Sequence, residues 1–112
     1  MFKIGFEDHY VWPVEVEVND GSVLTRHTFD AHFRRLPTSK LDSLMERVQS
    51  REASDTQLLG EVLVGWDGVK DAGGNDFGYS EKNRAILIEV YPVRPALVAA
   101  FFDSIKRGRE KN

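Results

Sequence analysis

The sequence predicts an α+β domain in which an antiparallel β-hairpin is followed by about four short helices. Three observations lead to this fold class. Apolar residues alternate with a period of two over residues 14–33, an Asp-Gly turn interrupts that alternation, and the period changes to about 3.6 after Pro37. Because the strands come first and the helices afterwards, we expect the two kinds of element to be segregated.

The hairpin is predicted from two alternating runs. Val14, Val16 and Val18 alternate with glutamates, a pattern that describes a strand with one buried face. Asp20-Gly21 then supplies the positive φ values of a tight hairpin turn. The second run places these residues on one side: Val23, Thr25, His27, Phe29, Ala31 and Phe33.

The first residues of the chain are compatible with a third strand. Phe2, Ile4 and Phe6 also alternate, so this segment either adds a strand or covers an edge of the sheet.

Two helices are predicted after Pro37. Thr38 or Ser39 is a plausible N-cap for a helix over residues 39–50, with Leu41, Leu44, Met45 and Val48 as its apolar stripe. Ser54-Asp55-Thr56-Gln57 matches a capping box and begins the second helix. Its predicted stripe continues as far as the tryptophan: Leu58, Leu59, Val62, Leu63 and Trp66.

Two further helices are predicted towards the C-terminus. Ser80 can cap a helix that carries Ile86, Leu87, Val90 and Tyr91 and stops at Pro92. Arg94-Pro95 restarts the chain, because proline suits the first helical turn, and Gly108 is expected to end the last helix. The stripe of that helix consists of Leu97, Val98, Phe101, Phe102 and Ile105.

Length and composition indicate one globular domain. The chain has 112 residues, of which 41% are hydrophobic and 29% charged. We expect a single domain over residues 1–112, divided into a β-rich part at 1–36, a helical part at 37–107 and a basic tail at 108–112. Residues 93–112 hold five basic residues against two acidic ones, whereas the whole chain has a net charge of −3. We interpret this tail as solubilising and not as a nucleic-acid site.

The absence of cysteine excludes Cys-based metal and redox motifs and favours a reducing compartment. Acidic residues at positions 7 and 8 stand where a signal peptide would be continuously apolar, and no stretch is apolar for long enough to span a membrane. We therefore expect a soluble, untargeted protein.

The stretch GWDGVKDAGGNDFGYS, residues 65–80, was tested for ion and phosphate chemistry. Counting from Asp67 or Asp71 does not reproduce the ligand spacing of an EF-hand loop. Lys70 precedes the glycines instead of following them, as a P-loop requires, and the spacing of a dinucleotide fingerprint is absent. The sequence thus predicts no cofactor, and it predicts a flexible hinge or turn at Gly73, Gly74 and Gly78.

No catalytic set can be assembled from the polar residues. His27 and His32 are five residues apart on one strand, so they point to opposite faces and cannot bind the same ion. Neither they nor His9 belong to a recognisable Ser/His/Asp pattern. We therefore predict a protein that is not an enzyme.

Most of the chain resembles the tail assembly chaperones of long-tailed bacteriophages and prophages. The resemblance lies in residues 11–45, in residues 64–105 and in the ending RGREKN. Its most characteristic part is Trp66-Asp67-Gly68-Val69, followed by Asp71, a glycine turn, Tyr79-Ser80-Glu81-Lys82-Asn83 and Ala100-Phe101. Pro92-Val93-Arg94-Pro95 departs from the family, which more often has a glycine after the proline.

The resemblance implies a non-enzymatic assembly factor in the cytoplasm of the bacterial host. Such a chaperone binds the tape-measure protein, keeps it soluble, recruits tail-tube protein and is absent from the mature virion. In many relatives a programmed frameshift yields a longer form. Self-association is a further option, and neither nucleic acid nor membrane is an expected partner.

We expect the last two helices, with Trp66 behind them, to form or border the partner surface. Its residues would be Trp66, Leu97, Val98, Phe101, Phe102 and Ile105. Two alternatives stay open: a tail completion or terminator component, and a small metal- or nucleotide-binding enzyme that uses the loop at residues 67–76.

Overall fold

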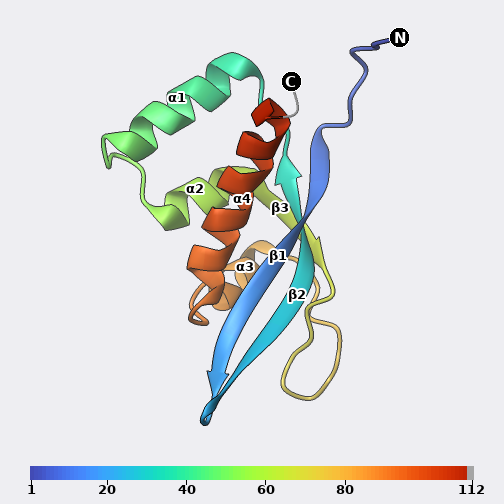
Figure 1. Cartoon of the computed structure of the whole chain (residues 1–112), viewed down its shortest axis with the longest axis vertical. Coiled ribbons are helices and arrows are strands. Elements are labelled where there is room, and N and C mark those ends of the chain that lie inside the picture. Colours follow the sequence, from blue (N-terminus) through green and yellow to red (C-terminus); the bar gives the residue numbers. More distant parts are fainter. Residues whose placement is uncertain (111–112) are drawn as a thin grey trace.

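The computed structural model describes the backbone of residues 1–110 and the side chains of residues 1–106. It has an α+β fold, as the sequence predicts, with one three-stranded antiparallel sheet in the order β1-β2-β3 (Figure 1). The elements are β1 (His9–Asp20), β2 (Val23–Arg34), α1 (Thr38–Gln49), α2 (Asp55–Val62), β3 (Leu63–Asp67), α3 (Glu81–Leu87) and α4 (Val93–Glu110). No helix within residues 1–110 is both long and apolar enough to cross a bilayer.

The predicted hairpin is confirmed. β1 and β2 pair from His9 with Arg34 to Asp20 with Val23, and Gly21 takes a φ of 66° in the turn. Val14 and Ala31 are completely buried on the face that the alternation predicts. Near the turn the hairpin extends beyond the helices (Figure 1), so residues such as Val23 of the same row stay exposed.

The third strand is not the one considered from the sequence. Residues 2–6 form no strand, and β3 instead follows directly on α2. The predicted continuation of the second helix to Trp66 is therefore wrong. A bulge between His32 and Phe33 lets Leu63 oppose Phe33 and Trp66 oppose Ala31, so two residues three apart both face the core. This bulged strand reproduces the spacing of a helical stripe, which explains the wrong prediction.

The helix caps are confirmed at two of three positions. Ser54 and Gln57 form a complete capping box, and the Oγ of Ser80 accepts a hydrogen bond from the backbone N–H of Asn83 at 3.0 Å. Neither Thr38 nor Ser39 caps α1, because that helix already begins at Thr38 and Pro37 occupies the N-cap without a side-chain bond.

Both predicted ends of the last two helices are wrong. α3 ends at Leu87, because the chain tightens there into turns in which Glu89 donates to the carbonyl of Ile86 and Val90 to that of Leu87, and Val90 and Tyr91 are exposed. α4 runs through Gly108 to Glu110. Glycine inside a helix costs only about 1 kcal/mol, which a long helix tolerates. The side chains of the predicted tail at 108–112 lie outside the described residues.

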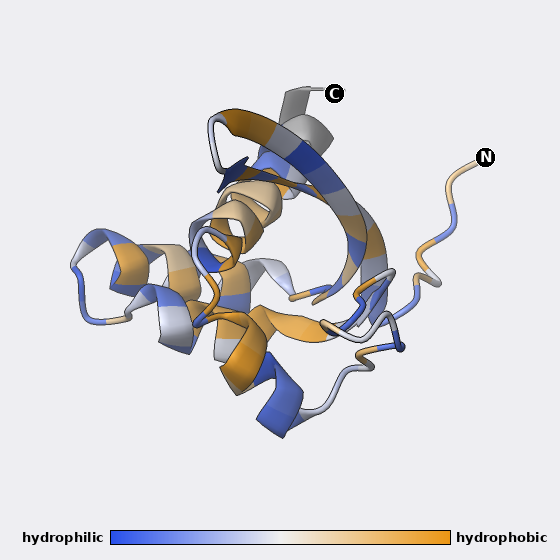
Figure 2. Cartoon of the chain, turned by 90° about the horizontal axis from the view of Figure 1, so that it is seen from below, coloured by the Kyte–Doolittle hydropathy of each residue, from blue (hydrophilic) through white to orange (hydrophobic). Residues whose placement is uncertain are grey.

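One hydrophobic core lies between the inner face of the sheet and the helices. Figure 2 shows hydrophobic segments of the helices on the concave side of the curved sheet. At its centre the rings of Phe33 and Phe101 meet edge to face, with centroids 5.3 Å apart. Its largest fully buried members are Phe33, Phe101, Leu44, Leu58, Leu59, Leu63, Leu97, Val14 and Val62.

Candidate partner-binding grooves beside α4

The predicted stripe of α4 divides into two rows. Leu97 and Phe101 are 0% and 1% exposed and therefore belong to the core. Val98, Phe102 and Ile105 are half-buried. The second row is the more accessible to a partner, whereas Phe101 reaches the surface only where it lines a groove described below.

Two grooves flank the C-terminal half of α4. The first, here called the β1–α4 groove, has a volume of about 540 Å³ and is lined by Tyr10, Trp12, Leu36, Leu41 and Ile105, among others. The second, the α1–α4 groove, has a volume of about 470 Å³, with Met45, Phe102 and Ile105 as its apolar lining. Ile105 lines both grooves, so the two form neighbouring parts of one region beside α4.

Helix α1 supplies the outer wall of this region. Among its residues only Leu44 is buried, whereas Leu41 and Met45 are half-exposed towards the grooves. The helix is amphipathic, and its apolar side is only partly used by the core. The sequence placed these residues on one apolar stripe, and periodicity does not distinguish a core stripe from an interface.

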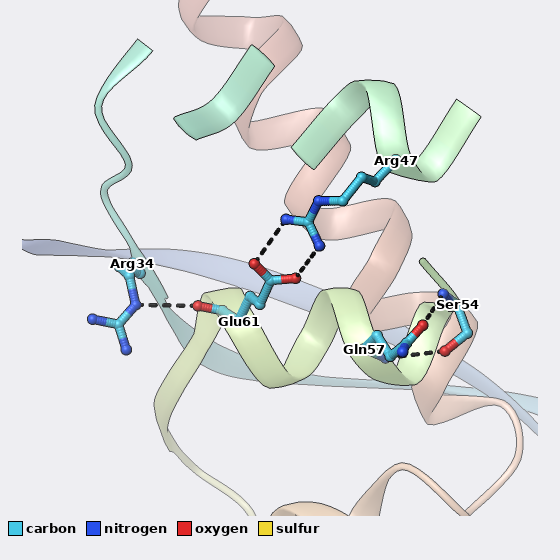
Figure 3. Close-up of polar contacts among 5 residues, drawn as sticks. All are labelled: Arg34, Arg47, Ser54, Gln57 and Glu61. Atoms are coloured by element: carbon cyan, nitrogen blue, oxygen red, sulfur yellow. Dashed lines mark hydrogen bonds and ion pairs between the residues drawn. The ribbon is translucent and has the colours of Figure 1, made fainter. Parts of the chain in front are cut away.

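A bidentate ion pair ties α1 to α2 (Figure 3). Arg47 donates from its two terminal nitrogens to the carboxylate of Glu61 at 3.0 and 2.9 Å, and Arg34 donates to the backbone carbonyl of Glu61 at 3.1 Å. The hydrogen bonds from Arg47 hold the pKa of Glu61 below its usual value and raise the pKa of Arg47. The ion pair thus ties the C-terminal part of α1 to α2.

The polar atoms of the β1–α4 groove are engaged with one another. The hydroxyl of Tyr10 lies 2.7 Å from the Oγ of Ser104, which in turn donates to the carbonyl of Phe101 at 2.6 Å. Burial raises the pKa of Tyr10. This chain of hydrogen bonds occupies both hydroxyls, so the groove can interact through its apolar side chains and through Arg34 and Arg35 at its rim.

Trp66 is not part of these grooves. It lies on β3, is 5% exposed and donates from Nε1 to the carbonyl of Phe77 at 2.6 Å. Its ring stacks on Phe77 and meets Tyr79 edge to face. Trp66 therefore does not lie on the second helix as predicted, because it belongs to β3, shares the buried core with Leu97 and Phe101 and anchors the loop that follows β3.

The loop after β3 is a tight, hydrogen-bonded turn. The Oδ1 of Asp71 accepts from the backbone N–H groups of Gly73 and Asn75 at 2.9 and 3.0 Å. Lys70 pairs with Asp76 and lowers the pKa of that carboxyl. Of the three glycines predicted as a hinge, only Gly74 has a positive φ, at 81°. Motion about Gly73, Gly74 and Gly78 stays a prediction.

A row of polar side chains on the outer face of the sheet was not predicted from the sequence. His9 and His32 stack with ring centroids 5.6 Å apart, and Nε2 of His32 lies 2.7 Å from Asp67. Asp8 bonds to His9 at 2.9 Å, and its pKa is lowered by that bond. The two imidazole rings are nearly parallel, so their nitrogens do not converge on a common ion. Within residues 1–106 no group of three metal-binding side chains is arranged to hold one.

Comparison with known proteins does not add to this description, because no family model, curated protein or solved structure matches the chain.

Proposed function

We propose that this protein is a bacteriophage tail assembly chaperone that binds apolar helical segments of the tape-measure protein and keeps them soluble until the tail tube forms. The observation that carries the proposal is the half-exposed row of Phe102 and Ile105 on α4, which lines two grooves at once. An apolar helix can place side chains spaced three or four residues apart into such grooves.

The size and chemistry of the grooves suit a helical ligand. Their volumes of about 540 and 470 Å³ can each take a few large side chains. The rims differ in charge: Arg34 and Arg35 lie beside the β1–α4 groove, whereas Asp42 and Glu46 outnumber Lys106 beside the α1–α4 groove. We therefore expect a bound helix to have an apolar stripe flanked by acidic residues on one side and basic residues on the other.

The hydroxyls of Tyr10 and Ser104 are already hydrogen-bonded, which favours a binding role for the groove over a catalytic one. Ser104 donates to a backbone carbonyl, so its hydroxyl is not directed at a base that could activate it. The proposal accordingly assigns no catalytic residue and no cofactor.

Co-expression with the tape-measure protein tests the proposal. Phe102→Asp and Ile105→Asp place a charge in the grooves and should leave the tape-measure protein insoluble. Val90→Asp is the matched control, because Val90 is 51% exposed and lies outside both grooves. Phe101→Asp is unsuitable, since Phe101 is buried and its loss would unfold the core.

Two results would contradict the proposal. One is that both groove variants remain folded by circular dichroism and keep the tape-measure protein soluble as well as the wild type does. The other is that the protein is found in purified virions, which would favour a tail completion component.

A further inference from the structure

The first eight residues of the chain form an arm with no place in the core of their own domain. The chain bends at Asp8 and leaves the sheet (Figure 1). Phe2, Ile4 and Phe6 are 75%, 85% and 59% exposed. They alternate with polar or small residues, a spacing that puts all three on one face of an extended strand. Three exposed apolar side chains with strand periodicity indicate a segment that pairs elsewhere.

A free sheet edge with a groove beside it offers such pairing. β1 is an edge strand, and within residues 1–110 no strand lies on its other side. Beside β1 lies a groove of about 700 Å³, lined by Trp12, Pro13 and Glu15 of β1, by Thr28 of β2 and by Ala96, Ala99, Ala100 and Asp103 of α4. Pro13 has no backbone N–H, so an added strand cannot accept a hydrogen bond from it. The alanines leave room for larger side chains from a strand added to β1. By contrast, residues 77–79 lie beside β3, the other edge strand, where the hydroxyl of Tyr79 donates to the carbonyl of Leu63.

The arm cannot cover the edge of its own chain without breaking contacts. The backbone N–H of Arg35 donates to the carbonyl of Asp8 at 2.8 Å, and its Nε donates to the carbonyl of Glu7 at 3.1 Å. Both bonds tie the root of the arm to the β2 side of β1, away from the free edge. The arm is therefore placed to reach another molecule.

We propose that residues 2–6 of one copy pair as a fourth strand with the free edge of β1 in a second copy, around residues 12–16. The side chains match this arrangement. The guanidinium of Arg35 lies 5.2 Å from the rings of both Phe6 and Tyr10, so these two aromatic residues already share a face. Opposed residues of paired strands project to the same face, so Phe2, Ile4 and Phe6 would join the row of Trp12, Val14 and Val16.

Charge complementarity supports the arm of a second copy as the strand that pairs with the free edge of β1. On the opposite face of the added strand, Lys3 would come near Glu15, whose partner in its own sheet is the uncharged Thr28. Pairing of β1 with β1 of a second copy would instead bring Glu15 and Glu17 near their own copies, and like charges across strands are unfavourable. In the single chain the rings of Phe2 and Phe6 lie 5.7 Å apart, so the arm must straighten to pair, and a Cβ placed on Gly5 would meet no other part of the chain within 4 Å.

Cross-linking of the full chain tests the pairing, because the protein has no cysteine of its own. Lys3→Cys and Glu15→Cys chains are mixed and treated with a short bismaleimide. We expect a cross-linked heterodimer for this pair and none when Lys3→Cys is mixed with Lys82→Cys, an exposed position on α3. Absence of the first product, or equal yields of both, would overturn the proposal.

Sedimentation velocity gives an independent measurement. The double change Phe2→Ser with Ile4→Ser should raise the dissociation constant of the dimer at least about tenfold, since it removes two apolar side chains from the interface. At concentrations where both proteins are monomeric the melting temperature should not change, because both side chains are exposed in the single chain. A wild type that stays monomeric, or a dimer that the double change leaves intact, would contradict the pairing. Neither measurement involves the tape-measure protein, so this test fails or succeeds separately from the proposed function.

Discussion

The hydroxyl of Tyr10 lies 2.7 Å from the Oγ of Ser104, so a hydrogen bond joins the first strand to the last helix across 94 positions of the chain. The contact is partly buried and closes the floor of the β1–α4 groove. We expect Tyr10→Phe to lower the free energy of unfolding by about 1 kcal/mol, the usual value of such a bond. Urea denaturation measures this change, with Ser43→Ala on the exposed side of α1 as a control. An unchanged midpoint would mean that water replaces the bond without cost.

The same tyrosine should make stability depend on pH in the alkaline range. Burial raises the pKa of Tyr10 above its unfolded value of about 10, so the folded state favours the protonated hydroxyl. This contribution is fully present below pH 10 and is lost as the pH rises through the pKa of the folded state. Thermal melts between pH 8 and about 11 should therefore converge for the wild type and Tyr10→Phe. If the difference in melting temperature between the two proteins stayed constant over this pH range, the alkaline effect could not be assigned to Tyr10.

The ion pair between Arg47 and Glu61 should stabilise α1 only modestly. Both side chains are partly exposed, so Glu61→Gln is expected to cost less than about 1 kcal/mol. Because the pKa of Glu61 is lowered in the fold, the contribution is present above its unfolded pKa and is lost as the pH falls through the lower, folded value. Hydrogen exchange should show faster opening of α1 in Glu61→Gln. Equal exchange rates in the variant and the wild type would show that the pair does not hold α1 in place.

Two glycines should respond to alanine in opposite directions. Gly60 lies in α2, where an added Cβ would meet only a flexible arginine end at 4.0 Å, so Gly60→Ala should stabilise by roughly 0.5–1 kcal/mol. At Gly65 the added Cβ would lie 3.3 Å from the Cβ of His32. His32 is held by Asp67 and His9 and cannot move freely, so Gly65→Ala should destabilise. Thermal melts of both variants test these two expectations. Stabilisation by Gly65→Ala would show that the side chain of His32 can move to make room for the added methyl group.

Substitutions of Asp71 can distinguish whether the loop after β3 is a structural turn or an ion-binding site. Its Oδ1 accepts two backbone hydrogen bonds, and asparagine can supply the same acceptor. We expect Asp71→Asn to keep the amides of Gly73 and Asn75 protected from exchange and Asp71→Ala to expose them. Calorimetric titration with calcium or magnesium should give no tight binding to the wild type. Tight binding that Asp71→Asn abolishes would instead favour the enzyme alternative.

Most of the fold could be predicted because its signals are local. The alternation in residues 14–33 and the Asp20-Gly21 turn specify the hairpin, and Ser54 and Ser80 mark helix starts through bonds to residues three positions away. β3 could not be predicted, because its identity depends on pairing with β2 across a bulge, which is a long-range contact. The stripe from Leu58 to Trp66 suits a helix and a bulged strand equally well.

The grooves were predicted in part. Periodicity selected Phe102 and Ile105, but it could not separate them from Leu97 and Phe101, which only the packing of α4 on the sheet buries. The contribution of Trp12 was missed, although Trp12 has the same parity as Val14 and Val16 on β1. Parity alone indicates the inner face, and only the position of α4 shows that this part of the face lines a groove.

The positions of the two tryptophans have a spectroscopic consequence. Trp12 is half-buried and lines both the β1–α4 groove and the groove along the free edge, whereas Trp66 is enclosed by the loop after β3. In a Trp66→Phe chain, the fluorescence of Trp12 would then report occupation of these grooves directly. In a Trp12→Phe chain, emission from Trp66 should stay constant until the domain unfolds. The chain thus carries one reporter for binding and one for folding, without any added label.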